Sequence, residues 1–127
     1  MGYESRLYIV EKSGFYTNCN ETPNDDFGRM CFAEVVAMID LCKVPELPAA
    51  INKYPDTDAY IYEGEERVLE DKYGARLKEI PLKDMTDIIT KIAKADNNQY
   101  RRWNPCLGLL KGFDTDGWDV VVLHYGH

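Results

Sequence analysis

Four consecutive apolar residues near the end of the chain, "VVVL" at positions 120–123, constrain the fold more than any other part of the sequence. Successive side chains of a β-strand point to opposite faces of a sheet, so a strand with such a run is buried on both faces. Strands of this kind lie in the interior of a sheet, and valine favours the extended conformation. The sequence therefore predicts that Trp118–Tyr125 is a central strand.

The segment before this strand contains three aspartates that resemble the start of a calcium-binding loop, Asp114, Asp116 and Asp119. An EF-hand loop needs glycine at its sixth position and glutamate at its twelfth, but Asp119 and Tyr125 stand there. Aspartate and glycine are also ordinary residues of turns, so a turn is the favoured interpretation. His124 and His127 face opposite sides of a strand and are not expected to share a metal ion.

Two helices are predicted in the second half of the chain. The longer one runs from about Pro81 to Ala95 and is amphipathic, because its apolar residues share one face while lysines and aspartates occupy the other. The apolar face consists of Leu82, Met85, Ile88, Ile89, Ile92 and Ala93. The shorter one is predicted from Pro105 to Lys111, with Asn104 as its N-cap and Gly112 at its end.

The apolar segment 29–44 allows two interpretations. Its residues Phe32, Val35, Val36 and Ile39 have the spacing of one helical face. The run is nevertheless apolar on almost every side, no good N-cap precedes it, and Pro45 follows it. A long central strand buried on both faces would show the same pattern, and we favour this second interpretation.

The remaining elements are short. Ser5–Glu11 is rich in β-branched and aromatic residues and is predicted to be a strand, and one or two helical turns are expected after Pro45. Three further strands, separated by reversals at Gly64 and Gly74, are predicted at Ala59–Glu63, Arg67–Asp71 and Leu77–Ile80. This order predicts one α+β domain over residues 1–127, with a single mainly antiparallel sheet and helices packed on one face.

The chain is acidic, with a formal net charge of −7 and a pI of about 4.8. Direct binding to nucleic acid requires a basic face and is disfavoured, whereas an acidic surface can dock onto a basic groove of another protein. The predicted acidic contacts are Glu63, Glu65, Glu66, Glu70 and Asp71. They also fit an ordinary solvated hairpin.

The motif "YRRWN" suggests a second binding patch formed by Arg101, Arg102 and Trp103, because arginine and tryptophan contribute strongly to protein interfaces. The ordinary interpretation, that Trp103 packs in the core and the arginines pair with acidic neighbours, is favoured by the residues alone, and stacking on the bases of a nucleic acid is a third possibility. High tyrosine content, nine residues in all, fits either a binding surface or the half-buried face of a sheet.

Catalytic signatures are weak. The four cysteines form no C-x-x-C pair, and no glycine-rich phosphate loop is present, so we expect no cofactor and no metal. We favour the interpretation that the cysteines are small buried apolar residues. Cys106 near a helix start would nevertheless have a lowered thiol pKa, so a cysteine- or histidine-dependent enzyme stays open. The start of the chain lacks a signal-peptide pattern and no stretch has the length of a membrane helix, so a cytoplasmic location is expected.

Four segments, "MGYESRLYIVEK", "VVAMIDLCKV", "YGARLKEIPLKD" and "VVLHYGH", resemble small uncharacterised proteins of phages and prophages in Gram-positive bacteria. The resemblance implies an accessory protein of a mobile element that acts in the host cytosol. Such proteins often bind and inhibit host proteins, and some are anti-CRISPR proteins. A non-enzymatic inhibitor of a host protein with a basic surface is therefore the favoured hypothesis, and a small-molecule or nucleotide binder is the alternative.

Overall fold

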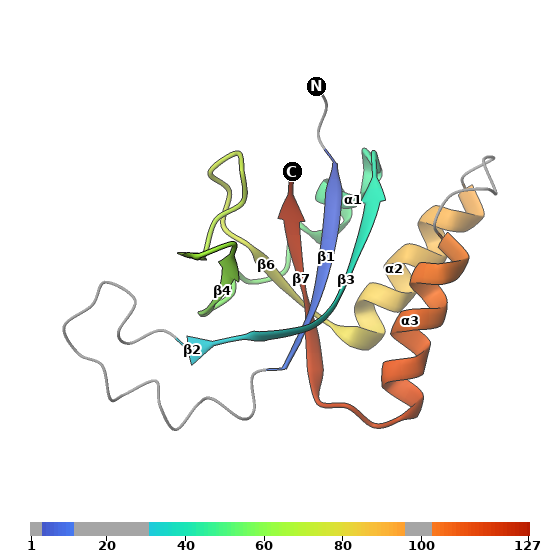
Figure 1. Ribbon diagram of the computed structural model, residues 1–127. Coiled ribbons are helices and arrows are strands. Elements are labelled where there is room, and N and C mark those ends of the chain that lie inside the picture. Colours follow the sequence, from blue (N-terminus) through green and yellow to red (C-terminus); the bar gives the residue numbers. More distant parts are fainter. Residues whose placement is uncertain (1–3, 12–30, 96–102) are drawn as a thin grey trace.

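The centre of the protein is a four-stranded antiparallel sheet (Figure 1). The computed structural model describes residues 4–11, 31–95 and 103–127. In spatial order, the sheet contains β3 (Glu34–Cys42), β1 (Ser5–Glu11), β7 (Val120–Gly126) and β6 (Lys78–Pro81). A second sheet contains β2 (Cys31–Phe32), β4 (Ala59–Glu63) and β5 (Glu66–Val68), and the helices are α1 (Glu46–Ile51), α2 (Leu82–Ala95) and α3 (Trp103–Thr115). The predicted α+β class and its mainly antiparallel sheet are confirmed, but the structure has a second, small sheet where the sequence predicted a single one.

The closing strand β7 lies in the interior of the main sheet, as the sequence predicts. It pairs antiparallel with β1 on one side and with β6 on the other. Val122 and Leu123 are both fully buried, although their side chains point to opposite faces. The apolar run of β7 is therefore continuous because each face of the strand is covered by another layer of the protein.

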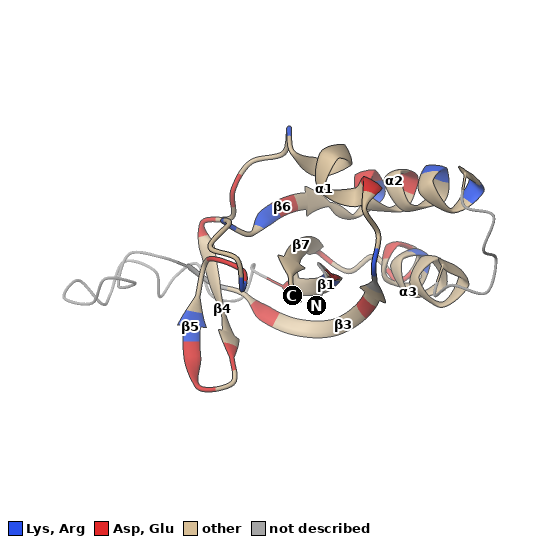
Figure 2. Cartoon of the chain, turned by 90° about the horizontal axis from the view of Figure 1, so that it is seen from above, with Lys and Arg blue, Asp and Glu red and all other residues tan. Residues whose placement is uncertain are grey.

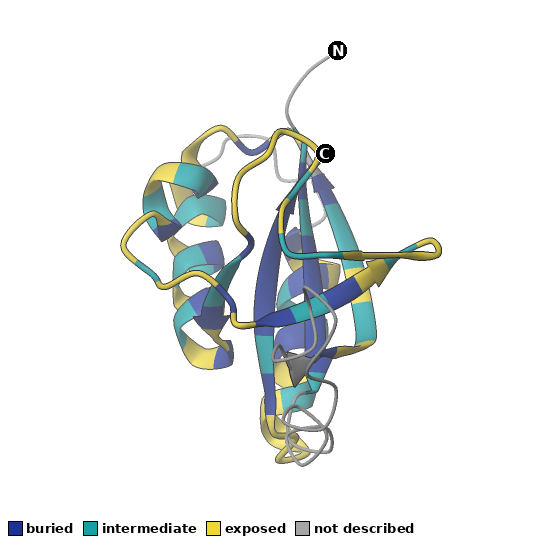
Figure 3. Cartoon of the chain, turned by 90° about the vertical axis from the view of Figure 1, so that its left-hand side faces the viewer, coloured by how far each residue is buried: buried dark blue, intermediate teal, exposed yellow. Residues whose placement is uncertain are grey.

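Those two layers are different in kind. The helices cover one face of β1 and β7, and their apolar cluster contains Leu7 and Ile9 of β1. The opposite face, with Tyr8 and Val10, is covered by the second sheet and its Ile61. Figure 2 shows α2 and α3 on one side of β1 and β7 and the β4–β5 hairpin on the other, and Figure 3 shows that the strands between them are buried along most of their length.

Strand β3 confirms the favoured interpretation of segment 29–44 but occupies an unexpected position. It is at the edge of the main sheet, not in its interior. Its exposed residues Val35 (36% exposed) and Met38 (49%) lie opposite Val10 and Tyr8 of β1. They belong to the same face of the main sheet as Tyr8 and Val10, but the second sheet covers this face over β1 and β7 and leaves β3 exposed. The expectation that β3 is buried on both faces is therefore wrong.

Helix α2 begins and ends almost where the sequence predicts, whereas α3 is longer than expected. Asn104 lies inside α3 and not at its N-cap, and Gly112 does not end it. Burial of Trp103, Cys106 and Leu110 along one face explains this length, because tertiary packing contributes more to helix stability than local propensity. The chain turns after α3 at Gly117, which has φ +76°.

The strands of the middle segment match the prediction unevenly. β4 has the predicted bounds, and the reversals at Gly64 and Gly74 are confirmed by their positive φ angles. β5 is shorter than predicted, since Glu70 forms only an isolated bridge with Arg76. β6 begins one residue later than expected.

Truncation of a side chain between β1 and the helices tests this architecture. Ile9 is fully buried in the helix-facing cluster, so Ile9→Ala is expected to lower the free energy of unfolding by about 2–5 kcal/mol. Met38→Ala, at the exposed edge strand, should change it by less than about 1 kcal/mol. Urea denaturation of both variants measures the difference, and equal losses would contradict the assignment of core and edge.

Candidate functional site

The β4–β5 hairpin projects from the body of the protein (Figure 2). Its strands pair through Glu63 and Glu66, and two residues, Gly64 and Glu65, form the turn between them. Gly64 has φ +66°, a conformation that glycine adopts without steric cost. The sequence "EGEE" therefore gives a tight turn with carboxylates on and beside its tip.

Glu63 anchors the hairpin to the main sheet. The hydroxyl of Tyr8 donates a hydrogen bond to Glu63 Oε2 over 2.9 Å. Arg6 Nη1 donates to the Tyr8 hydroxyl over 3.0 Å and lies 3.6 Å from Glu63 Oε1. Tyr8 also packs edge-to-face against Tyr125, with ring centroids 5.9 Å apart. These contacts fix the position of the turn end of β4 relative to β1 and β7.

Electrostatics keep Tyr8 and Arg6 each in one protonation state at neutral pH. Burial of the phenol is the main cause of the raised pKa of Tyr8, and the hydrogen bond to Glu63 adds to it while Arg6 acts in the opposite direction. Burial tends to lower the pKa of Arg6, but Tyr8, Glu63 and Asp40 outweigh this effect and the pKa is raised. Tyr8 therefore stays a donor and Arg6 stays charged.

The five predicted acidic contacts separate into two groups. Glu65, Glu66 and Glu70 are exposed, so their carboxylates are accessible to a partner. Glu63 is half-buried and belongs to the anchor described above. Asp71 has a structural role, which comes from its hydrogen bonds.

Asp71 ties the loop after β5 to the end of β7. Its Oδ1 accepts hydrogen bonds from the backbone N–H groups of Tyr73 (2.8 Å) and Ala75 (3.0 Å). Its Oδ2 accepts one from the N–H of Gly126 (3.3 Å). An aspartate that accepts several backbone N–H groups stabilises a turn, so the role of Asp71 in the fold is independent of any partner.

The second predicted patch is not formed by Trp103. This residue is only 7% exposed and belongs to the helix-facing hydrophobic cluster, because α3 begins at Trp103 and directs it toward the core. Trp103 is therefore a core residue, and its prediction as a surface contact is wrong. Arg101 and Arg102 lie outside the described residues.

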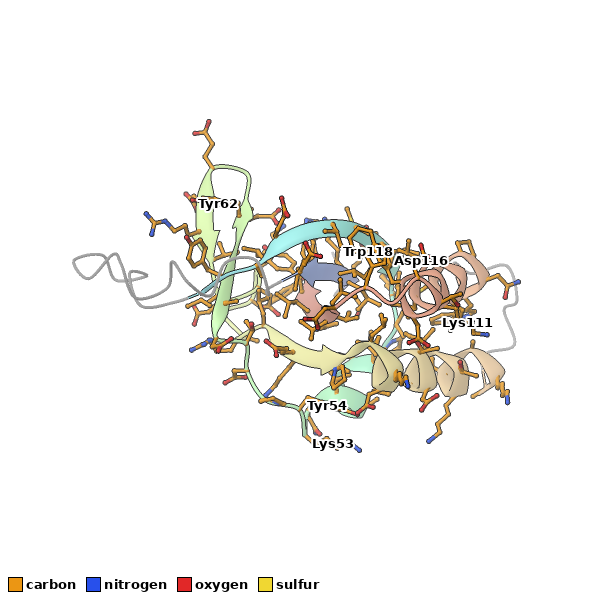
Figure 4. The ribbon with its side chains drawn as sticks, turned by 90° about the horizontal axis from the view of Figure 1, so that it is seen from below. Lys53, Tyr54, Tyr62, Lys111, Asp116 and Trp118 are labelled. Atoms are coloured by element: carbon orange, nitrogen blue, oxygen red, sulfur yellow. The ribbon has the colours of Figure 1, made fainter. Side chains whose placement is uncertain are left out.

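Two of the tyrosines, for which the sequence left a binding surface and a half-buried sheet face equally open, form an aromatic outer face of the hairpin. Tyr60 and Tyr62 pack edge-to-face at 5.8 Å, and the Arg67 guanidinium lies 5.5 Å from the Tyr60 ring centroid. Tyr62 is 48% exposed and lies on the hairpin in Figure 4. Strand alternation was the available signal, because Ile61 between the two tyrosines is buried. Exposed tyrosine beside arginine is typical of binding surfaces.

The candidate nucleophile Cys106 has a raised thiol pKa, and not the lowered pKa expected near a helix start. It is fully buried, and burial raises the pKa of its thiol to about 12. The thiol is therefore protonated at neutral pH and packs as a small apolar group. Cys19 lies outside the described residues.

His124 is buried between β1 and β6. Its Nε2 lies 2.9 Å from the hydroxyl oxygen of Ser5, which is also fully buried. Burial lowers the pKa of His124 to about 4, and the charge of Asp71 opposes this shift. The imidazole is neutral at pH 7, and the buried Ser5 hydroxyl is not presented to a substrate.

The described part of the chain contains neither a metal-binding cluster nor a helix that could cross a membrane. Within residues 4–11, 31–95 and 103–127, no group of three or more histidine, cysteine, aspartate or glutamate side chains is placed to hold a metal ion. In the same residues, no helix combines the length and the apolar character that crossing a membrane requires.

Comparisons with known proteins do not assign the chain to a family. No family model matches the sequence, and neither a curated protein nor a solved structure with significant similarity was found.

Protonation of His124 is expected to destabilise the fold in a defined pH range. The pKa is 6.5 in the unfolded chain and about 4 in the folded one, so the unfolded chain binds the extra proton between these values. Stability from this group is complete above pH 6.5 and falls by about 3 kcal/mol as the pH decreases to 4. Urea denaturation of wild type and His124→Gln from pH 7 to 4 should show a smaller decrease in the variant, and parallel curves would contradict the assignment.

The anchor of the hairpin is tested by Tyr8→Phe, which keeps the ring but removes both hydrogen bonds of the hydroxyl, the one donated to Glu63 and the one accepted from Arg6. Loss of these bonds should lower the free energy of unfolding by about 1–3 kcal/mol and speed amide exchange in β4 and β5. Tyr54→Phe is the matched control, because it removes a hydrogen bond of 2.9 Å to Asp84 near α1 and α2 (Figure 4). Faster hairpin exchange in both variants, or in neither, would refute the anchoring role.

Proposed function

We propose that this protein is a non-enzymatic binding protein that docks the β4–β5 hairpin onto a basic surface of another protein. The observation that carries the proposal is the combination of an acidic, exposed tip with a half-buried anchor beside it. Glu65 and Glu66 are exposed at the tip, while Glu63, which pairs with Glu66 beside the turn, is held by Tyr8 and Arg6.

The anchor favours binding because it reduces the cost of ordering. A flexible acidic loop loses conformational freedom when it docks, and that loss opposes binding. The hairpin is held by paired strands and by the contacts of Glu63 before any partner arrives. Its carboxylates are thus presented in a defined geometry.

A groove that normally holds a nucleic-acid backbone is the partner surface that best matches this chemistry. Such grooves are basic, and carboxylates on a rigid hairpin can occupy the positions of phosphates. The acidic overall charge disfavours direct contact with nucleic acid itself. Tyr62 supplies an exposed aromatic contact beside the acids.

The resemblance to small phage and prophage proteins adds a biological setting to the proposal. In that setting, the partner is a nucleic-acid-handling defence protein in the host cytosol, and docking of the hairpin inhibits it, as anti-CRISPR proteins do. Glu70 extends the acidic surface beyond the tip, and Arg101 and Arg102 stay predicted contacts of a second patch.

Charge reversal at the tip tests the proposal. The double variant Glu65→Lys/Glu66→Lys should retain at least roughly tenfold less of its partner from a host lysate, because attraction becomes repulsion. The control is Asp114→Lys/Asp116→Lys, which changes the net charge equally at exposed positions near the end of α3; Figure 4 shows Asp116 far from Tyr62 of the hairpin.

The amounts of each protein retained by the wild type and by the two variants are compared. Retained proteins are identified and measured for wild type and both variants at two salt concentrations, since an interaction of opposite charges weakens as salt increases. A partner that is retained equally by the tip variant, or lost equally with the α3 control, would refute docking through the hairpin.

A further inference from the structure

A hollow of about 390 Å³ lies beside the hairpin, along β5 and the loop that follows it. Its volume is within the range of small-molecule sites. The lining residues are Arg67, Val68, Leu69, Glu70, Asp71 and Arg76. Half-buried Val68 and Leu69 provide apolar surface, and the other four provide charges of both signs.

The guanidinium of Arg76 is held in place by a neutral group. Its Nη2 donates a hydrogen bond of 2.8 Å to the carbonyl oxygen of Thr57. Thr57 is itself buried, and its hydroxyl oxygen accepts a hydrogen bond from the N–H of Ala59 over 3.1 Å. Because a carbonyl carries no net charge, this contact positions Arg76 without neutralising it.

Arg67 lies at the same hollow and is positioned by an aromatic ring. Its guanidinium carbon is 5.5 Å from the centroid of Tyr60, within the distance of a cation–π contact. Two arginines on one hollow favour a ligand with a carboxylate, since the guanidinium fork matches that group.

The two acids of the hollow differ in what they offer to a ligand. Asp71 already accepts three backbone N–H groups, as described above. Glu70 is exposed, and its backbone pairs with that of Arg76 across the narrow loop. Glu70 therefore places an accessible negative charge next to the positive charge of Arg76.

We propose that this hollow binds a zwitterionic ligand of the α-amino acid type with an apolar side chain. Arg67 and Arg76 bind the carboxylate, Glu70 binds the ammonium group, and Val68 and Leu69 contact the side chain. This proposal does not depend on docking of the hairpin tip, because neither Glu65 nor Glu66 lines the hollow.

A titration with three related probes tests the proposal. L-Leucine carries both charges, leucinamide lacks the carboxylate, and 4-methylpentanoate lacks the ammonium group. Backbone amide shifts of the ¹⁵N-labelled protein are followed at millimolar probe concentrations. L-Leucine should shift the amides of residues 67–71 and 76, and each of the other two probes should bind at least roughly tenfold more weakly, since each loses one charge-assisted contact.

Substitutions assign the two charged contacts. Arg76→Gln should weaken L-leucine and 4-methylpentanoate at least roughly tenfold, and Glu70→Gln should weaken L-leucine and leucinamide. Lys91→Gln, an exposed cation on α2, is the control and should leave all three affinities unchanged. A matching amide spectrum away from the hollow shows that each variant is folded.

Two results would overturn the proposal. The first is the absence of shifts at residues 67–71 and 76 with every probe. The second is binding of 4-methylpentanoate or inorganic phosphate as tight as that of L-leucine, because either outcome would make the hollow a general anion site. Charge reversal at Glu65 and Glu66 should leave L-leucine binding intact, which separates this test from that of the hairpin.

Discussion

Burial of β1 and β7 on both faces is the constraint on which the rest of the structure depends. Leu7 and Ile9 of β1 face the helices, while Tyr8 and Val10 face the second sheet. One covering layer would leave half of these side chains in water, at a cost of about 1.5–3 kcal/mol for each fully exposed large apolar residue. The helices and the second sheet are therefore both required by the same two strands.

The second layer also produces the candidate surface. Ile61 of β4 is buried against the main sheet, so Tyr60 and Tyr62 on either side of it point away. The strand that closes the core thus carries an aromatic outer face and continues into the acidic tip. Stability and the proposed binding are linked through Glu63, whose contacts with Tyr8 and Arg6 join the two layers.

The elements that have one strong hydrophobic pattern were predicted well from the sequence. The amphipathic pattern gave α2, and the valine run gave the central position of β7. For segment 29–44 the pattern predicted a strand correctly but placed it in the interior of the sheet, whereas β3 lies at the edge. An apolar run does not show how far the second sheet extends over the main one. Among the candidate site residues, Glu65, Glu66 and Glu70 are exposed, as a contact surface requires. Trp103 was predicted at the surface because two arginines precede it in the sequence, but it is buried because it lies on the inward face of α3.

The sequence by itself determined the α+β class, the interior position of the last strand and the turn at Gly64, since each follows from local geometry: side-chain alternation, helical spacing and the steric freedom of glycine. Only the tertiary structure decided which acids are accessible. Asp71 and Glu65 look alike in the sequence, but Asp71 accepts N–H groups from its own loop and from Gly126, 55 residues away. Hydrogen bonds between distant segments depend on how the chain packs, and no local pattern encodes them.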